Sequence, residues 1–423
     1  MKPASVARIL FITAITLLAA VLSAPAEVML QWFETEWDEM YLRTPEVAEA
    51  GYTYIWTPPP TKAPTGLGTK WGNVGYSLYD RFDIGDIPQR GSWATRYGTR
   101  GSLRNMVNQM HQCDVKIIPD IVMNHTGNGP DIREYPGTRV TDFHVWYQSG
   151  YCNGLNYKRA PRMTEWSPNG GYGATMYQDL CNLQDLRTED CYLTRLDGTA
   201  NRFTTGYPSG PQFVDGESFI RHIGQYDRYP YYTNDISTYK AEEASDMLYR
   251  WIAWLGFAMD YDGLRLDAGK HTPQEFFGND NNGFLHEAQY NQSRRRGYDN
   301  YNDNTDVFRI DINRKRSLIF AEILSGWSDI LYWANNNPMR FLDYAIKKTA
   351  DGALNGNIGA FYGSGTDFGP EKGIMYIWGH DEGPASKVDL GYAYTLTHIG
   401  IPMVYFTGNN IQWSDKNSGY TWM

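Results

Sequence analysis

The chain has 423 residues, of which 42% are hydrophobic and 20% charged, and its formal net charge is −10. This composition is typical of one large globular domain with insertions and excludes a disordered chain. The acidic balance disfavours nucleic acid as a partner, whereas a neutral polyhydroxylated ligand is compatible with it and with an aromatic content of 15%.

Residues 1–26 are typical of a secretory leader. Lys2 and Arg8 precede an apolar run at 9–20, and small residues at 24–26 offer a cleavage site before Glu27. A membrane anchor is the alternative, but the apolar run is shorter than the ~20 residues that a spanning helix needs. We therefore expect export to the periplasm or the extracellular space, and a mature monomer without a membrane anchor.

Strand-like and helix-like segments alternate through the rest of the chain. Apolar runs of strand length occur at 28–33, 52–57, 115–122, 261–266, 318–323, 340–344, 374–378 and 403–406. Helical patterning occurs at 38–50, 101–112, 241–256, 327–335 and 385–398. Eight strands alternating with helices predict a TIM (β/α)8 barrel, in which the active site lies at the carboxyl ends of the strands.

A long excursion follows the third predicted strand. Residues 126–187 are rich in Gly, Tyr, Asn and Pro, and they predict a small protruding insertion domain. The barrel itself is then expected over 27–125 and 188–423. Two further polar stretches, 188–240 and 279–304, are expected to be long loops within it, either lids or disordered insertions.

Four cysteines follow the leader, namely Cys113, Cys152, Cys181 and Cys191. In an oxidising compartment an even number can pair fully, and three connectivities are open. We favour Cys152 with Cys181, because both fall in the loop-rich insertion. Reduced packing residues are the alternative, and zinc is disfavoured because no close paired spacing occurs.

Four acids end apolar runs, namely Asp120, Asp267, Glu322 and Asp381. A single acid in this place is more often a turn former or a helix cap, but four at one edge of a barrel indicate a reaction centre. Arg265 and Asp267 are two residues apart on a predicted buried strand, so they point to the same side. The guanidinium favours the ionised carboxylate, which makes Asp267 a credible nucleophile.

Four segments in order resemble the signatures of the α-amylase family of glycoside hydrolases. They are 120–125, 263–271, Ala321-Glu322 and 379–381. The resemblance covers nearly all of the mature chain, since Gly75-Tyr76 resembles the loop after the family's second strand and 400–402 its eighth strand. It implies retaining endo-hydrolysis of α-1,4-glucosidic bonds through a covalent glycosyl intermediate, with Asp267 as nucleophile, Glu322 as general acid and base, and Asp381 supporting the transition state.

The resemblance also implies which residues bind the substrate. His125 and His380 would hydrogen-bond the sugar at the scissile bond, Tyr76 would stack on it, and Arg265 and Lys270 complete the set. Lys270-His271 after the nucleophile resembles the endo-acting members, so the expected substrate is starch or a malto-oligosaccharide. An α-glucosidase or an α-glucan transglycosylase on the same barrel stays open, as does a carbohydrate-binding relative without catalysis.

A Ca²⁺ site is implied in the same way, with ligands at Asn124, Asp179, Asp185 and the backbone carbonyl of His271. Carboxylate, amide and carbonyl oxygens are the ligands that this cation prefers. Residues 183–186 resemble the family's fifth signature, although Gln184 stands where that signature usually has proline. The alternative is that Asp179 and Asp185 are solvated loop acids.

The chain departs from the family pattern in two places. Gly379 stands where an asparagine usually precedes the histidine and aspartate of the fourth signature, so one hydrogen-bonding side chain is missing near the site. After the eighth predicted strand only 407–423 remain, and the family's last barrel helix and C-terminal β-sandwich domain are expected to be absent. Either this is a fragment or the barrel closes unusually.

Overall fold

The computed structural model describes the barrel and parts of its connections. The described residues are 27–63, 74–78, 81–87, 92–126, 244–272, 274–278, 283–295, 317–325, 327–357, 359–362 and 372–408, with short strands at 132–134, 139–141, 147–148, 184–185, 193–195 and 200–201. The predicted leader, Cys152, Cys181, Cys191 and Asp179 lie outside them. Within the described part, no helix combines the length and the apolar character needed to cross a membrane.

Eight parallel strands close into a barrel in the order β1-β15-β14-β13-β12-β11-β3-β2. Their bounds are β1 Met29–Phe33, β2 Tyr54–Thr57, β3 Lys116–Ile121, β11 Gly263–Leu266, β12 Leu318–Ala321, β13 Arg340–Leu342, β14 Gly373–Met375 and β15 Ile401–Thr407. The first and last strands complete the ring, with Met29 opposite Met403 and Phe33 opposite Thr407. Each strand overlaps one of the eight predicted runs, so the TIM barrel is confirmed.

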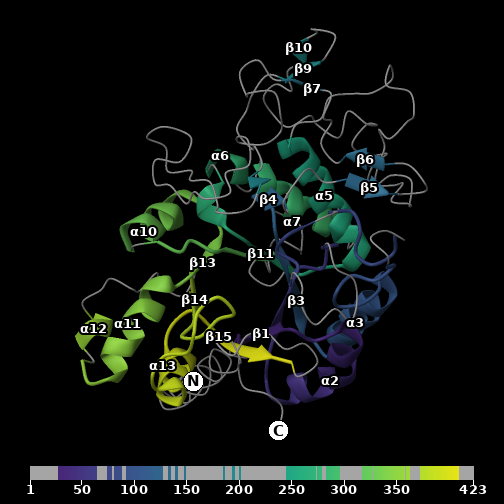
Figure 1. The fold of residues 1–423 in the computed structure, drawn as a ribbon. Helices are drawn as coiled ribbons and strands as arrows, with labels where there is room; N and C mark the ends of the chain where they lie inside the picture. The colour runs from purple at the N-terminus through teal and green to yellow at the C-terminus, as the bar shows by residue number, and fades with distance from the viewer. Residues whose placement is uncertain are drawn as a thin grey trace, which may run out of the picture.

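The strands are buried along nearly their whole length because both of their faces are covered. All five residues of β1 and all four of β2 and β11 are buried. One set of side chains fills the barrel and the other packs against the surrounding helices, which is why parallel strands lack polar alternation. Figure 1 shows these helices around the outside of the ring.

Five of the helices match predicted segments: α2 Trp37–Glu49, α3 Arg100–Gln112, α5 Ala244–Met259, α10 Trp327–Asn336 and α13 Val388–Thr397. The start of α3 shows why the chain turns helical there. The Thr99 side chain accepts a hydrogen bond from the Ser102 amide, and the Ser102 side chain accepts one from the Thr99 amide. This capping box satisfies amides that have no helical partners.

Two longer helices were not among the predicted segments. Helix α7 (Gly283–Arg295) lies within 279–304, which the composition favoured as a loop, and the prediction is wrong there. Phe284, Leu285 and Ala288 are buried at helical spacing, and α7 packs on α5, so tertiary contact outweighs the polar composition. Helix α11 (Tyr344–Leu354) is capped by the Asp343 carboxylate, which accepts from the Ile346 amide at 2.9 Å.

Shorter helical segments complete the described part: α6 Gln274–Phe277, α12 Gly359–Tyr362 and the 3-10 turn η2 Gly269–His271. The long connection between β3 and α5 contains small antiparallel sheets outside the barrel sheet. β4 (His125–Thr126) pairs with β8 (Gln184–Asp185), and β5 (Ile132–Glu134) with β6 (Arg139–Thr141). β7 (Tyr147–Gln148) and β10 (Ala200–Asn201) flank β9 (Leu193–Arg195), so segments before and after residue 187 share one sheet. Cys113, after α3, is a half-buried free cysteine among the described residues.

Candidate active site

The centre of the site is the guanidinium of Arg265 in β11, which is fully buried. Its Nη1 donates to Asp120 Oδ1 at 2.7 Å and to Asp267 Oδ1 at 2.6 Å, and its Nη2 lies 2.8 Å from Glu322 Oε2. These three acids stand on β3 or directly after β11 and β12, which are adjacent strands. Because Asp267 and Glu322 bond one guanidinium, they lie side by side and not on opposite walls of the barrel.

The turn after β11 helps to hold this pair. Ala268 has a φ of 50°, a left-handed conformation that L-residues other than Asn and Asp rarely adopt. In this conformation its amide donates to Glu322 Oε2 at 3.1 Å. Backbone strain of this kind concentrates at functional sites, where the surrounding structure compensates for it.

The electrostatics of Asp267 differ in part from the sequence-based expectation. Burial raises the pKa of Asp267 well above its usual value; Arg265 lowers it, as expected, but Glu322, Asp120 and Asp381 raise it further. One guanidinium is shared among several acids, so it cannot offset the charge of all of them. Asp267 therefore retains its proton more readily than an isolated aspartate does.

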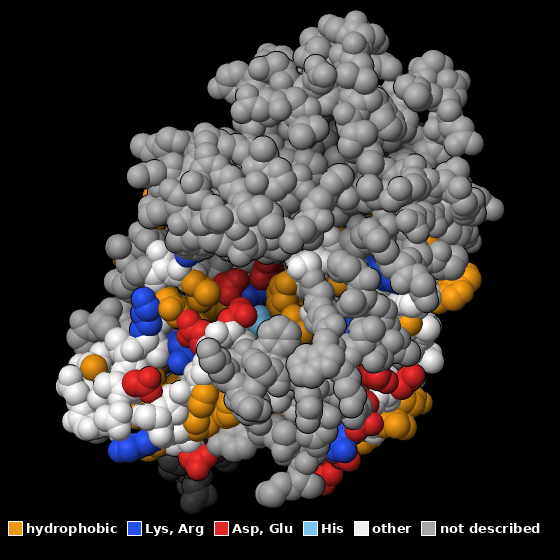
Figure 2. Space-filling model, in the orientation of Figure 1, with side chains coloured by type: hydrophobic (Ala, Val, Ile, Leu, Met, Phe, Trp, Pro, Cys, Tyr) orange, Lys and Arg blue, Asp and Glu red, His pale blue; other side chains and the backbone are white. Residues whose placement is uncertain are grey.

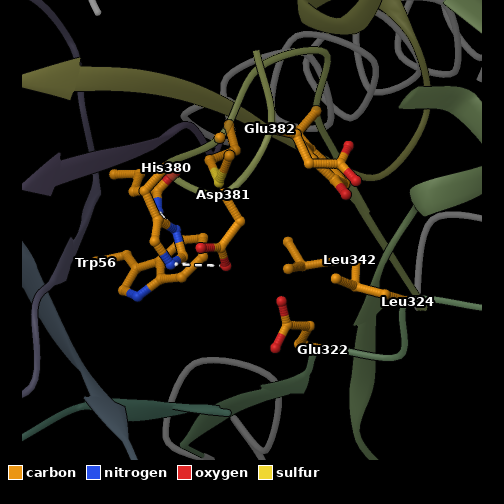
Figure 3. A pocket seen from close by; sticks show the side chains of 11 residues that line it. Trp56, Glu322, Leu324, Leu342, His380, Asp381 and Glu382 are labelled. Atoms are coloured by element: carbon orange, nitrogen blue, oxygen red, sulfur yellow. Dashed lines mark hydrogen bonds and ion pairs between the residues drawn. The ribbon is translucent and has the colours of Figure 1, made fainter. Parts of the chain in front are cut away.

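Asp381 follows β14 and faces Glu322 across a pocket (Figure 3). It lies 2.9 Å from His380 Nε2, and its side chain is 55% exposed. Partial removal from water acts to raise the pKa of Asp381, although the side chain is exposed at the surface; the charge and hydrogen bond of His380, with Arg265, outweigh this and lower the pKa to about 2. Asp381 is therefore a carboxylate across the ordinary pH range.

Tyr76 and His380 form a second polar contact beside the acids. The Tyr76 hydroxyl donates to Asp120 Oδ2 at 2.7 Å and lies 2.8 Å from His380 Nε2. The two rings are stacked, with centroids 5.3 Å apart and 5° between their planes. The structure thus brings together Tyr76 and His380, two of the candidate substrate residues.

The other predicted substrate residues lie nearby. His125 Nε2 is 3.1 Å from the backbone oxygen of Tyr76 and 3.9 Å from Asp267 Oδ2. Lys270, in the turn after Asp267, donates to the backbone oxygen of Leu324 at 2.7 Å. This bond ties the loops after β11 and β12 together. Figure 2 shows acidic, basic and histidine side chains gathered in a hollow of this face.

Three further residues of the site were not singled out from the sequence. Trp56 in β2 donates from Nε1 to Asp120 Oδ2 at 3.1 Å, and its ring lies 5.1 Å from the Arg265 guanidinium carbon. Gln31 in β1 lies 2.7 Å from His380 Nδ1. Glu382 directly follows Asp381 and lines the same pocket, which encloses about 260 Å³ including space open to solvent. An adjacent acid in the fourth signature was a signal for Glu382, whereas Gln31 and Trp56 look like ordinary strand residues.

The predicted calcium ligands can be placed in part. Asn124 is buried; its Oδ1 lies 3.3 Å from the Thr272 hydroxyl, and its Nδ2 has no hydrogen-bond partner. The oxygen and nitrogen of a side-chain amide have nearly the same shape. The Asn124 atom without a partner can therefore equally be the oxygen, directed at a cation. His271 precedes Thr272, and β4 places the backbone of Asp185 opposite His125. Three of the four predicted positions therefore converge, although the described side chains alone form no cluster of three or more His, Cys, Asp or Glu able to hold a metal.

The chain is similar to known proteins of the family that its signatures resemble. Residues 45–190 match the family model described as alpha amylase, catalytic domain. The chain is 26% identical over 261 residues to an alpha-amylase of Bacillus licheniformis, a match that covers 59% of this chain and 46% of that protein. It is 22% identical over 395 residues to a glucan 1,4-alpha-maltohexaosidase of Bacillus sp. (strain 707), which covers 89% of this chain and 70% of that protein.

The fold is also similar to that of solved structures. An alpha-amylase from Geobacillus thermoleovorans complexed with acarbose matches with a TM-score of 0.53 and 16% identity, over 93% of this chain and 74% of that one. At this identity the likeness concerns the fold. The acids at the carboxyl ends of the strands lie where TIM-barrel enzymes carry their active sites. The matches then confirm the resemblance that the four signatures predict: the chain is related to the α-amylase family, and its match spans about half the length of the Bacillus licheniformis relative.

Proposed function

We propose that this protein hydrolyses α-1,4-glucosidic bonds within starch-like glucans and retains the anomeric configuration. The observation that carries the proposal is the Arg265 guanidinium, which holds Asp267 and Glu322 side by side while Asp381 faces Glu322 across the pocket. Neighbouring carboxyl groups are what a retaining glycosidase needs, because one must attack the sugar carbon while the other protonates the departing oxygen.

The proposed reaction has two steps. Asp267 attacks the anomeric carbon and Glu322 donates a proton to the glycosidic oxygen, so that the bond to the leaving sugar breaks as the glycosyl ester forms. Glu322 then takes a proton from water, which attacks the same carbon and releases Asp267. Ionised Asp381 offsets the positive charge that develops on the sugar.

The test is digestion of soluble starch with sizing of the early products. A mixture of malto-oligosaccharides is expected, and E322Q should lower kcat by about 10²–10⁴-fold because a general acid and base is lost. Circular dichroism of the variant checks that the barrel still forms. Release of glucose alone would reject internal cleavage, and no release from starch would reject the proposal.

Transfer to another sugar is the competing activity on the same site. The comparisons include a gamma-CGTase from Alkalophilic bacillus clarkii, whose likeness to this chain at 15% identity concerns the fold. The glycosyl ester proposed here can be resolved by a sugar hydroxyl as well as by water. Digestion in the presence of a labelled glucose acceptor separates the two: label in the products at a rate above that of hydrolysis would favour transfer.

We also propose that Ca²⁺ stabilises the junction between the barrel and the long connection after β3. Asn124, the carbonyl of His271, Asp185 and Asp179 would hold it; when bound, the cation would supply charge that ties these segments together. Removing it with a chelator should lower Tm by several degrees, and added Ca²⁺ should restore it. An unchanged Tm in both directions would reject the site.

Export is proposed on the 1–26 segment alone. Expression of the full chain in a host with a secretory pathway should yield extracellular or periplasmic protein that begins near Glu27. N-terminal sequencing and intact mass measure this, and light scattering of the same material tests the expected monomer. Retention of Met1 in the recovered protein would reject the leader.

A further inference from the structure

Gly379 has no structural reason to be glycine. It does not have the positive φ that favours glycine, and it forms a two-residue bridge with Glu382 through mutual backbone hydrogen bonds of 3.4 and 3.3 Å. A Cβ built on it would lie 3.6 Å from both Gln31 Oε1 and Tyr376 Cε2, which are ordinary contacts. Neither backbone conformation nor crowding therefore accounts for the missing side chain.

The space beside Gly379 contains an unsatisfied polar group. Gln31 is fully buried; one end of its amide, Nε2, lies 2.7 Å from His380 Nδ1, and the other, Oε1, has no hydrogen-bond partner. A buried polar atom left without a partner costs about 1–3 kcal/mol. If the two amide atoms are exchanged, the atom without a partner becomes a donor, but it still faces the same space.

This space belongs to the pocket at the proposed active site. Gln31, Gly379, His380, Asp381 and Glu322 all line it, and its remaining wall is largely apolar, formed by Leu342, Tyr376 and Met403 among others. Figure 3 shows the open region between Asp381, Glu382, Leu342 and Glu322. A group that enters here meets one buried amide atom and has few other polar partners on the apolar side.

We propose that a hydroxyl group of the glucan enters the space left by Gly379 and hydrogen-bonds the Gln31 amide, which makes Gln31 a substrate-binding residue and Gly379 a specificity-determining one. A hydroxyl both donates and accepts, so it satisfies either orientation of the amide. The inference rests on the proposed function, because it assigns a contact to the substrate of that same site.

The experiment pairs one enzyme variant with a series of substrates. Gly379→Ala places a methyl group in the space without a clash, and kcat/KM is measured for a malto-oligosaccharide and for its monodeoxy analogues. In the wild type, one analogue should react roughly ten-fold more slowly, which corresponds to one hydrogen bond. Gly379→Ala should lower kcat/KM for the parent sugar roughly ten-fold. For that analogue the substitution should cause no further loss, because the hydroxyl is already missing.

Gly352→Ala is the matched control, because a Cβ there meets nothing within 4 Å and the residue lies exposed on α11. It should behave as the wild type on every substrate. Two results would show that the inference is wrong: Gly379→Ala cleaves the parent sugar as well as the wild type does, or it is as sensitive as the wild type to the loss of each hydroxyl. In either case an ordered water, or no group at all, bonds Gln31. Glucan hydrolysis would be unaffected by this outcome.

Calorimetric titration with the parent sugar separates this inference from the proposed function. A wild type that binds the sugar without cleaving it, together with roughly ten-fold weaker binding by Gly379→Ala, would reject hydrolysis and support the contact. Absence of both binding and cleavage would reject the two proposals together.

Discussion

Arg265 combines structural and electrostatic roles that no other cation can fill. Its planar guanidinium donates from Nη1 to Asp120 and Asp267, and its Nη2 lies 2.8 Å from Glu322. The four side chains are buried. Lysine has the same charge but only one nitrogen, so it cannot span the three acids. Arg265→Lys should therefore lower the free energy of unfolding by roughly 3 kcal/mol, as when one partner of a buried ion pair is lost.

The same change should reduce kcat/KM at least about ten-fold, because Asp267 and Glu322 would no longer be held side by side. Arg43→Lys is the matched control: Arg43 pairs with Glu39 and Glu46 on the partly exposed face of α2, where such pairs contribute little. Denaturant titration and starch digestion measure both variants. Equal losses in the two would show that Arg265 has no special role.

Glu34 gives the fold a pH dependence that does not come from the catalytic acids. It follows β1, has a φ of 56° and is 3% exposed. Burial raises the pKa of Glu34 from 4.5 to about 7, against the opposing charges of Arg96 and His380. The folded state thus holds a proton that the unfolded chain releases between these two pH values.

The sign follows from proton linkage: stability is not penalised below pH 4.5, falls as pH rises toward 7, and is then constant, with a total loss of roughly 3 kcal/mol. Glu34→Gln removes the titrating group, so its gain in Tm over the wild type should be larger at pH 8 than at pH 4.5. The exposed Glu49→Gln serves as control and should show no such difference. Parallel Tm profiles for wild type and Glu34→Gln would contradict the shifted pKa.

At the residue scale, the sequence allowed prediction of the acids but not of everything around them. Asp120, Asp267, Glu322 and Asp381 each end an apolar run, and a parallel barrel places all such ends at one rim. Gln31 and Trp56 lie within strands whose residues are all buried. The sequence of those strands does not distinguish a residue that faces the site from one that faces the core. The difference appears only in the folded barrel, where β1 pairs with both β2 and β15.

Lys62 is a buried cation that links distant parts of the connection from β2 to α3. Lys62 Nζ donates to the backbone oxygens of Ser92 and Ala94 at 2.9 and 2.8 Å and lies 3.6 Å from Asp83 Oδ2, with both side chains inaccessible to solvent. Asp83 in turn accepts from the Gly85 amide at 2.8 Å. One ammonium thus joins both ends of a connection that also carries Tyr76.

Lys62→Met should therefore lower the free energy of unfolding by roughly 3–5 kcal/mol, because it leaves a buried carboxylate and several carbonyls without their donor. Lys387→Met is the control, since Lys387 is exposed at the start of α13, and it should change stability by less than about 0.5 kcal/mol. Urea titration measures both. A small effect at Lys62 would mean that water replaces the ammonium.

At the element scale, prediction succeeded where the apolar pattern was dense. The strands and five helices are recognisable because burial demands apolar residues at regular spacing. Helix α7 carries Asn, Gln, Ser and Arg beside its few buried residues, so its stripe is narrow and its composition favours a loop. Its stability comes from contact with α5, which no local pattern records.

At the scale of the whole molecule, the site depends on the ring being closed. The acids come from strands of the second half of the chain and from β3, whereas Gln31 and Trp56 come from the first two strands. β1 joins the halves, because it pairs with β2 on one side and with β15 on the other. A destabilising substitution in β1 is therefore expected to weaken folding and, through it, the placement of the acids on the other strands.

Leu30 tests this dependence. It lies in the middle of β1, opposite Ile55 and Val404, and is 3% exposed. Leu30→Ala should lower the free energy of unfolding by about 3 kcal/mol, since the lost methyl groups leave a cavity in a packed layer. Leu42→Ala makes the same chemical change on α2 at a side chain that is 67% exposed, so it should cost less than about 0.5 kcal/mol. Denaturant titration of the pair, with glucan hydrolysis measured well below the transition, should show a loss of stability for Leu30→Ala alone and retained activity where the barrel is folded. Equal stability of the two variants would show that the contact between the first and last strands does not limit the stability of the barrel.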